Sequence, residues 1–120
     1  MTLAAILVVD SDTSARESIA RELRELGHEV SESGDAGTAL QAARRSRPDL
    51  MVCEFSLPDL GGIELLSDVR RSDDLRRIRI LMTSERNGSE EVVTALQSGA
   101  DDFVSKPIDM PELLARVGAC

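Results

Sequence analysis

Carboxylate, hydroxyl and ammonium groups follow the apolar runs of this sequence, at the points where those runs end. Asp10 follows the first run, and Glu54 ends a later one. Ser84 and Lys106 come after two further runs. Oxygen ligands of this kind suit Mg²⁺, and a lysine and a hydroxyl beside a carboxylate can hold or imitate a phosphoryl group. The residue types therefore predict a polar site for a divalent cation or an anionic group.

Each of these residues has a simpler explanation when it is taken alone. A single acidic residue at the end of a strand is most often a helix cap or a solvated surface group. Ser84 alone would be another local cap, Lys106 a surface lysine and Pro107 a loop residue. Only their joint occurrence in this chain order favours a common site.

Apolar runs alternate with amphipathic stretches along the whole chain. Strands are predicted for residues 3–9, 28–30, 50–53, 78–82 and 102–105. Helices are predicted for residues 14–26, 36–43, 63–69, 89–96 and 111–117, where apolar positions recur at helical spacing. The alternation predicts an α/β fold with a doubly wound parallel sheet and helices on both faces. Ligands bind beyond the carboxyl ends of the strands in such sheets, where the polar residues lie.

Several residues mark where the helices should start and stop. Ser14 and Glu17 form a capping-box pattern at the start of the first helix, and Gly27 should end it. Asp35 and Ser89 are expected to cap two further helices.

Size, composition and charge limit the possible functions. The 120 residues suffice for one domain, and 14 basic against 22 acidic residues give a net charge of −8. That balance argues against direct binding of nucleic acid, whose phosphates need a positive surface. No apolar run approaches the length of a membrane span and no signal-peptide pattern is present, so we expect a cytoplasmic location. Because the last predicted helix lies so close to Cys120, we expect residues 1–120 to be the N-terminal part of a longer protein.

Five stretches of the chain resemble the receiver domains of two-component response regulators. They are residues 6–10, 48–50, 57–62, 80–84 and 99–107, with the last the most specific. The resemblance covers essentially the whole chain with family-like spacing. It implies a CheY-like sheet of five parallel strands in the order 2-1-3-4-5, and a signalling module instead of an enzyme.

The resemblance also implies roles for individual residues. In the family, an acidic pair after the first strand holds Mg²⁺, and an aspartate after the third accepts a phosphoryl group from a histidine kinase. A hydroxyl, a lysine and an aromatic residue respond to that group, and the lysine precedes a cis proline. The positions carried over are Asp10, Glu54, Ser84, Phe103, Lys106 and Pro107.

Three departures from the family pattern fall in the site itself. Glu54 stands where the family has aspartate, and its carboxylate extends roughly 1.5 Å further, whereas in-line phosphoryl transfer is sensitive to displacements of about 1 Å. We therefore expect no phosphorylation there. Ser11 replaces the second acid of the pair, which leaves Asp10 and Glu54 as weak Mg²⁺ ligands. Glu85 adds a carboxylate that should repel phosphodonors.

The sequence thus predicts an atypical, phosphorylation-independent receiver domain that acts as a regulatory switch or protein-interaction module. Glu54 could reach toward Ser84 and Lys106 and hold an active-like state. Alternatively the switch is frozen and only a binding surface remains, or Glu54 is a tolerated substitution in a domain kept for packing.

Other hypotheses remain open at this stage. A conventional receiver could use another carboxylate, such as Asp10 or Asp59, as its acceptor. A haloacid-dehalogenase-type phosphatase would use the motif at residues 10–13, although the acidic pair at 101–102 then precedes the lysine instead of following it. A flavodoxin-like cofactor module lacks the glycines and aromatic residues it would need.

The family commonly binds partners through its fourth helix, fifth strand and fifth helix. That face corresponds here to residues near 90–106 and 110–117. The resemblance implies a protein partner there, which is an effector domain, a cognate kinase or a second copy of the chain, and neither nucleic acid nor a membrane.

Overall fold

The computed structural model describes residues 3–85 and 89–120, in which strands and helices alternate strictly. The strands are β1 (Ala5–Val9), β2 (Glu29–Ser33), β3 (Leu50–Glu54), β4 (Arg79–Ser84) and β5 (Asp102–Ser105). The helices are α1 (Thr13–Glu25), α2 (Ala36–Ser46), α3 (Gly62–Arg71), α4 (Ser89–Gln97) and α5 (Met110–Ala119). None of the helices in this described part of the chain has the length and apolar character needed to span a bilayer.

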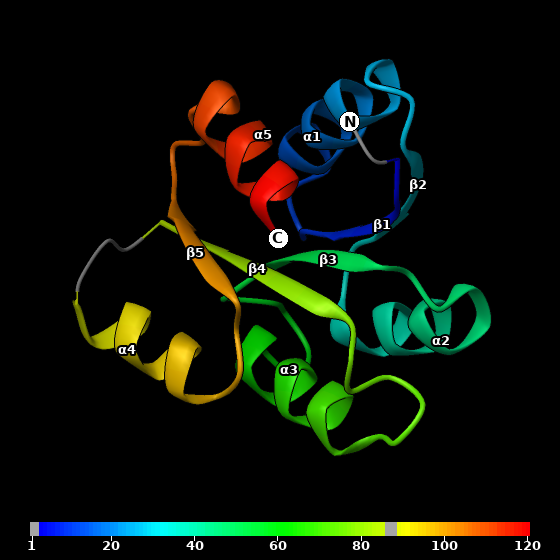
Figure 1. Cartoon of the computed structure of the whole chain (residues 1–120). Helices are drawn as coiled ribbons and strands as arrows, with labels where there is room; N and C mark the ends of the chain where they lie inside the picture. Colours follow the sequence, from blue (N-terminus) through cyan, green and yellow to red (C-terminus); the bar gives the residue numbers. More distant parts are fainter. Residues whose placement is uncertain (1–2, 86–88) are drawn as a thin grey trace.

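The strands form one parallel sheet in the order β2-β1-β3-β4-β5, which confirms the predicted topology (Figure 1). The register pairs Leu7 with Met51 across β1 and β3, and Met51 with Ile80 across β3 and β4. These central strands are apolar at nearly every position because helices cover both faces of the sheet.

Two apolar cores form, one on each side of the sheet. Leu7 and Val9 of β1 face the core beneath α2, α3 and α4, whereas Ile6 and Val8 face the core beneath α1 and α5. Successive residues of a strand point to opposite faces, so one apolar run serves both cores. Figure 1 shows α1 and α5 together on one side of the sheet and the other helices on the opposite side.

The ends of several elements differ from the sequence-based prediction. The capping box at Ser14 is wrong: the Asp12 side chain caps α1 by accepting from the backbone N–H groups of Ser14 and Ala15, so the helix starts one residue earlier. β1 begins at Ala5, so Leu3 lies outside the sheet, and β2 runs beyond Val30 to Ser33. These shifts leave the order of elements unchanged.

Other predicted helix signals are confirmed. Asp35 caps α2 through a hydrogen bond from the Thr38 N–H, and Gly27 follows α1 with a positive φ of 96°. Ser89 is the first residue of α4, and the cap predicted for its side chain lies outside the described residues.

Candidate functional site

The carboxyl ends of β1, β3 and β5 bring together two carboxylates and one ammonium group. Lys106 Nζ lies 2.9 Å from Asp10 Oδ2 and 3.0 Å from Glu54 Oε2. Asp10 is 1% exposed and Glu54 8% exposed, so both ion pairs are shielded from water. The sequence predicted that these three residues share one site, and the structure places them in direct contact.

The second oxygen of Glu54 is held by Ser11. Glu54 Oε1 accepts hydrogen bonds from the Ser11 backbone N–H at 3.0 Å and from its hydroxyl at 2.7 Å. Burial raises the pKa of Glu54, but the hydrogen bonds from Ser11 and Lys106 outweigh it and hold that pKa below its usual value. The carboxylate is therefore ionised and bonded at both oxygens.

Asp10 and Lys106 complete this arrangement. Asp10 Oδ1 accepts from the backbone N–H of Asp12 at 2.8 Å, while its other oxygen binds Lys106. Burial lowers the pKa of Lys106, but the hydrogen bonds from its ammonium to Asp10 and Glu54 raise it by more. The pKa of Lys106 is therefore above its ordinary value. The contacts with the two carboxylates thus favour the charged form of the lysine.

Ser84, at the end of β4, is tied to the neighbouring helix. Its hydroxyl donates a hydrogen bond to Glu91 Oε1 of α4, and its backbone carbonyl accepts from the Lys106 N–H at 2.6 Å. Ser84 is buried, and Phe103 of β5 packs half-buried against the core beneath α4. Sequence reasoning missed Glu91; the only signal for it was an acidic residue in the first turn of α4.

A hollow opens beside Lys106, between α1 and the start of α5. This cavity of about 670 Å³ is lined by Lys106, Pro107 and Glu85 together with apolar side chains that include Ile19 and Met110. The Lys106–Pro107 peptide bond is cis. Glu85 and Lys106 thus line the same cavity, and Glu85 adds a carboxylate to it.

The alternative acceptor Asp59 and the cysteine next to Glu54, Cys53, lie in different surroundings. Asp59 is exposed, and its oxygens accept from the N–H groups of Ala36 and Gly37 at the start of α2, which lowers its pKa. Cys53 is fully buried, and burial together with the charge of Glu54 raises the pKa of its thiol far above the ordinary value. Asp59 therefore serves as a helix cap, and Cys53 as an inert core residue.

Comparison with known proteins identifies the family. The fold matches the chemotaxis response regulator CheY4 of Vibrio cholerae with a TM-score of 0.92 and 27% identity, over 98% of each chain. It also matches NtrX from Brucella abortus with a TM-score of 0.91 and 30% identity, over 98% of this chain and 26% of that one. Residues 6–118 match the response regulator receiver domain, and the chain therefore belongs to that family.

Curated relatives support the same assignment. The chain is 39% identical to the response regulator MprA of Mycobacterium leprae over 95% of this chain and 49% of that protein. It is 40% identical to the DNA-binding response regulator MtrA of Mycolicibacterium smegmatis, again over 95% of this chain and 49% of that protein. The chain thus spans about half the length of these relatives. Two-component receiver domains interact with kinases and effector domains, and the assignment to them replaces the phosphatase and flavodoxin hypotheses.

Proposed function

We propose that this receiver domain works without phosphorylation, as a fixed protein-interaction module. The observation that carries the proposal is the Glu54 carboxylate, which takes the place of the family's acceptor aspartate. One of its oxygens accepts two hydrogen bonds from Ser11, and the other binds Lys106. A phosphoryl acceptor must offer a carboxylate oxygen to its donor, and both Glu54 oxygens already have partners, which lowers their availability.

Neither alternative acceptor is better placed. Asp10 is 1% exposed and already binds Lys106, so a phosphodonor has no access to it. Asp59 is accessible, but its oxygens are bonded to the start of α2, and no lysine contacts it. The surroundings of both residues favour a domain that does not accept phosphate.

The donor set is also poor for Mg²⁺. Among the described residues, no group of three or more His, Cys, Asp or Glu side chains could hold a metal ion. Asp10 and Glu54 both face the Lys106 ammonium, and Ser11 supplies a neutral hydroxyl that donates to Glu54. A hard dication prefers several free oxygen ligands, so we expect its binding here to be weakened.

The position of Ser84 favours a frozen switch over an active-like one. Glu54 reaches Lys106, but the Ser84 hydroxyl donates to Glu91 of α4. Ser84 and Lys106 therefore do not converge on one surrogate phosphoryl group. The roles of Ser84, Phe103 and Lys106 as switch residues remain predictions.

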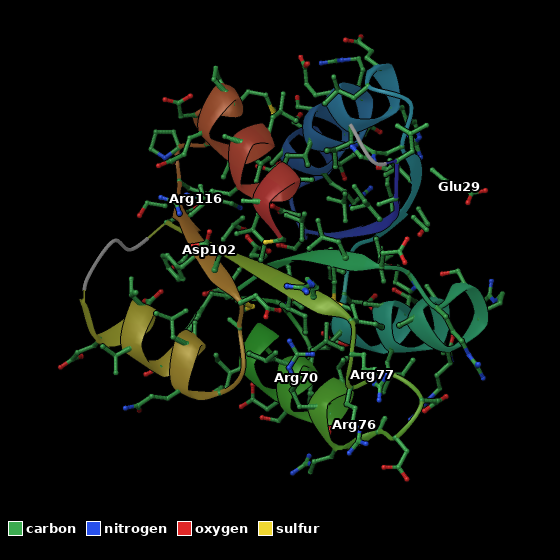
Figure 2. All side chains as sticks on the ribbon, in the orientation of Figure 1. Glu29, Arg70, Arg76, Arg77, Asp102 and Arg116 are labelled. Carbon is green, nitrogen blue, oxygen red and sulfur yellow. The ribbon has the colours of Figure 1, made fainter. Side chains whose placement is uncertain are left out.

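The surface best suited to a partner is the face of α4, β5 and α5. Val93 and Leu96 of α4 are 48% and 47% exposed. On the other two elements of this face, Arg116 of α5 pairs with Asp102 of β5 at 3.0 Å, as Figure 2 shows for the two labelled side chains. Exposed apolar residues beside ordered charges are typical of a protein-binding surface, and we propose an effector domain, a kinase or a second copy of the chain as its partner.

Incubation with Mg²⁺ and acetyl phosphate, followed by intact mass measurement, tests this proposal. We expect no phosphoryl adduct on the native chain. Glu54→Asp is the matched control, because it restores the shorter acceptor and frees space beside Ser11 and Lys106. An adduct on the native chain, mapped to any carboxylate, would overturn the proposal.

A further inference from the structure

A second cavity lies at the opposite end of the sheet, where the strands begin. It has a volume of about 730 Å³ and is lined by residues that include Leu50 and Arg79, the first residues of β3 and β4, and Val117 of α5. Its size falls in the range of ligand-binding clefts. Nothing in the receiver site described above uses this end of the molecule.

Three arginines that line this cavity have no ion-pair or hydrogen-bond partner for their side chains among the described residues. Arg47, Arg77 and Arg79 line it, and three further arginines precede or flank them in the chain. Figure 2 shows Arg76 and Arg77 together on the loop between α3 and β4. Within residues 3–85 and 89–120, this group makes no side-chain ion pair or hydrogen bond, in contrast to the arginines that form ion pairs elsewhere. The group comprises Arg44, Arg45, Arg47, Arg76, Arg77 and Arg79.

Acidic residues offset this charge only in part. Asp49 and Asp74 also line the cavity, and Asp73 adjoins it in the chain. One oxygen of Asp49 is already used by the Ala5 N–H, at 2.9 Å. The lining side chains therefore comprise three arginines against two aspartates, a difference of one positive charge, in a protein whose net charge is −8.

His28 adds a directed hydrogen-bond donor. Its Nδ1 accepts from the backbone N–H of Ala4 at 3.0 Å, and an amide can only donate, so the ring proton of the neutral histidine lies on Nε2. His28 is 9% exposed and lines the cavity. In the described part of the chain, Nε2 has no acceptor, so its N–H is available to a ligand oxygen.

The rest of the lining is apolar. Leu3 and Leu26, at its edge, are 58% and 39% exposed, and Leu114 and Val117 of α5 continue the apolar surface. The cavity thus combines cationic and N–H donors with aliphatic side chains. A ligand that matches it needs carboxylates and aliphatic groups within a few ångströms of each other.

We propose that this cavity binds an acidic protein segment that carries aliphatic side chains between its carboxylates. Arginine binds carboxylates through paired N–H groups, and leucine-like side chains of the segment would cover Leu3 and Leu26. Nucleic acid fits less well, because neither phenylalanine of the chain lines the cavity to stack a base, and the aspartates would repel phosphates.

Fluorescence anisotropy with a labelled peptide, Glu-Leu-Glu-Glu-Leu-Glu, tests the proposal on the 120-residue chain. We expect saturable binding that weakens about tenfold on Arg77→Glu and further on Arg77→Glu combined with Arg79→Glu. Arg21→Glu is the matched control: Arg21 is exposed on α1, away from the cavity, and changes the net charge equally. Equal thermal unfolding of the variants would show that each is folded.

Three results of this anisotropy assay would overturn the proposal. They are no saturation up to about 1 mM peptide, equal affinity for the peptide with glutamine in place of glutamate, or an equal loss in Arg21→Glu. Tighter binding of a single-stranded oligonucleotide of the same charge would also overturn it and would identify a nucleic-acid surface. Glu54→Gln should leave peptide binding unchanged, which separates this proposal from the one made for the receiver site.

Discussion

The charged side chains at the two ends of the sheet differ in burial and in pairing. At the carboxyl end, the Lys106 ammonium pairs with the buried carboxylates of Asp10 and Glu54. At the amino end, Arg77 and Arg79 are exposed, and their side chains have no ion-pair or hydrogen-bond partner within residues 3–85 and 89–120. Charges that are satisfied internally contribute to stability, whereas unpaired charges are available to another molecule. We propose a structural role for the charges at the carboxyl end of the sheet and a binding role for those at the amino end.

Removal of the lysine should produce the largest effect at the carboxyl end. Lys106→Met leaves two buried carboxylates facing each other without a cation, and loss of one partner from a buried ion pair costs about 3 kcal/mol. Urea unfolding measures the change in the free energy of unfolding. Arg71→Met is the control, because its ion pair with Asp68 is exposed and should contribute less than about 1 kcal/mol. Equal effects for the two variants would contradict the account.

Removal of the serine hydroxyl should produce a smaller loss. Ser11→Ala deletes the hydrogen bond of the hydroxyl to Glu54 but keeps the one from the backbone N–H, and should cost about 1–2 kcal/mol. Ser56→Ala, at an exposed loop position, should stay within about 0.5 kcal/mol of the native chain in the same urea experiment. A neutral Ser11→Ala variant would show that Glu54 does not depend on this contact.

The pH dependence of stability follows from the shifted pKa values. The pKa of Glu54 is depressed in the folded state, so its contribution is present above its unfolded value of about 4.3 and is lost as the pH falls through the folded value. The pKa of Lys106 is raised, so its contribution is present below about 10.4 and is lost in more alkaline solution. The stability difference between the native chain and Glu54→Gln should therefore shrink in acid. A difference that stays constant from neutral pH to pH values below the folded pKa would contradict this assignment.

The smallest effect is expected at the amino end. Arg77→Ala should change the free energy of unfolding by less than about 0.5 kcal/mol, because the side chain has no partner to lose. Arg70→Ala is the sharpest comparison: its guanidinium donates to the carbonyls of Gly99 and Ile78 and pairs with Asp101, and its loss should cost about 2 kcal/mol. If both variants lost a comparable free energy of unfolding, the difference proposed between the paired Arg70 and the exposed Arg77 would be contradicted.

Sequence reasoning succeeded wherever periodicity and chain order decide the outcome. The alternation of apolar runs and helical patterns predicted a parallel sheet with helices on both faces, and the resemblance to receiver domains implied its strand order. The carboxyl-end rule brought Asp10, Glu54 and Lys106 together. Both follow from topology, which a linear pattern encodes directly.

Side-chain geometry could not be foreseen in the same way. From the sequence, Ser11 indicated only a missing carboxylate, but in the structure its hydroxyl and backbone N–H both donate to Glu54. The contact of Ser84 with Glu91 depends on where α4 packs, and the donor of His28 depends on a hydrogen bond from Ala4. Such pairings depend on distances between segments far apart in sequence, which spacing alone does not report.

The central claim is that Glu54, with both oxygens bonded to Ser11 and Lys106, does not accept a phosphoryl group. Nuclear magnetic resonance spectra of backbone amides, recorded during titration with Mg²⁺ and beryllofluoride as a phosphoryl mimic, test it most directly. The account predicts no saturable shifts at Ser11, Glu54, Ser84 or Lys106 of the native chain, and shifts at these positions in Glu54→Asp. Saturable shifts in the native chain that spread into α4 would show that the switch still responds, and would contradict the account.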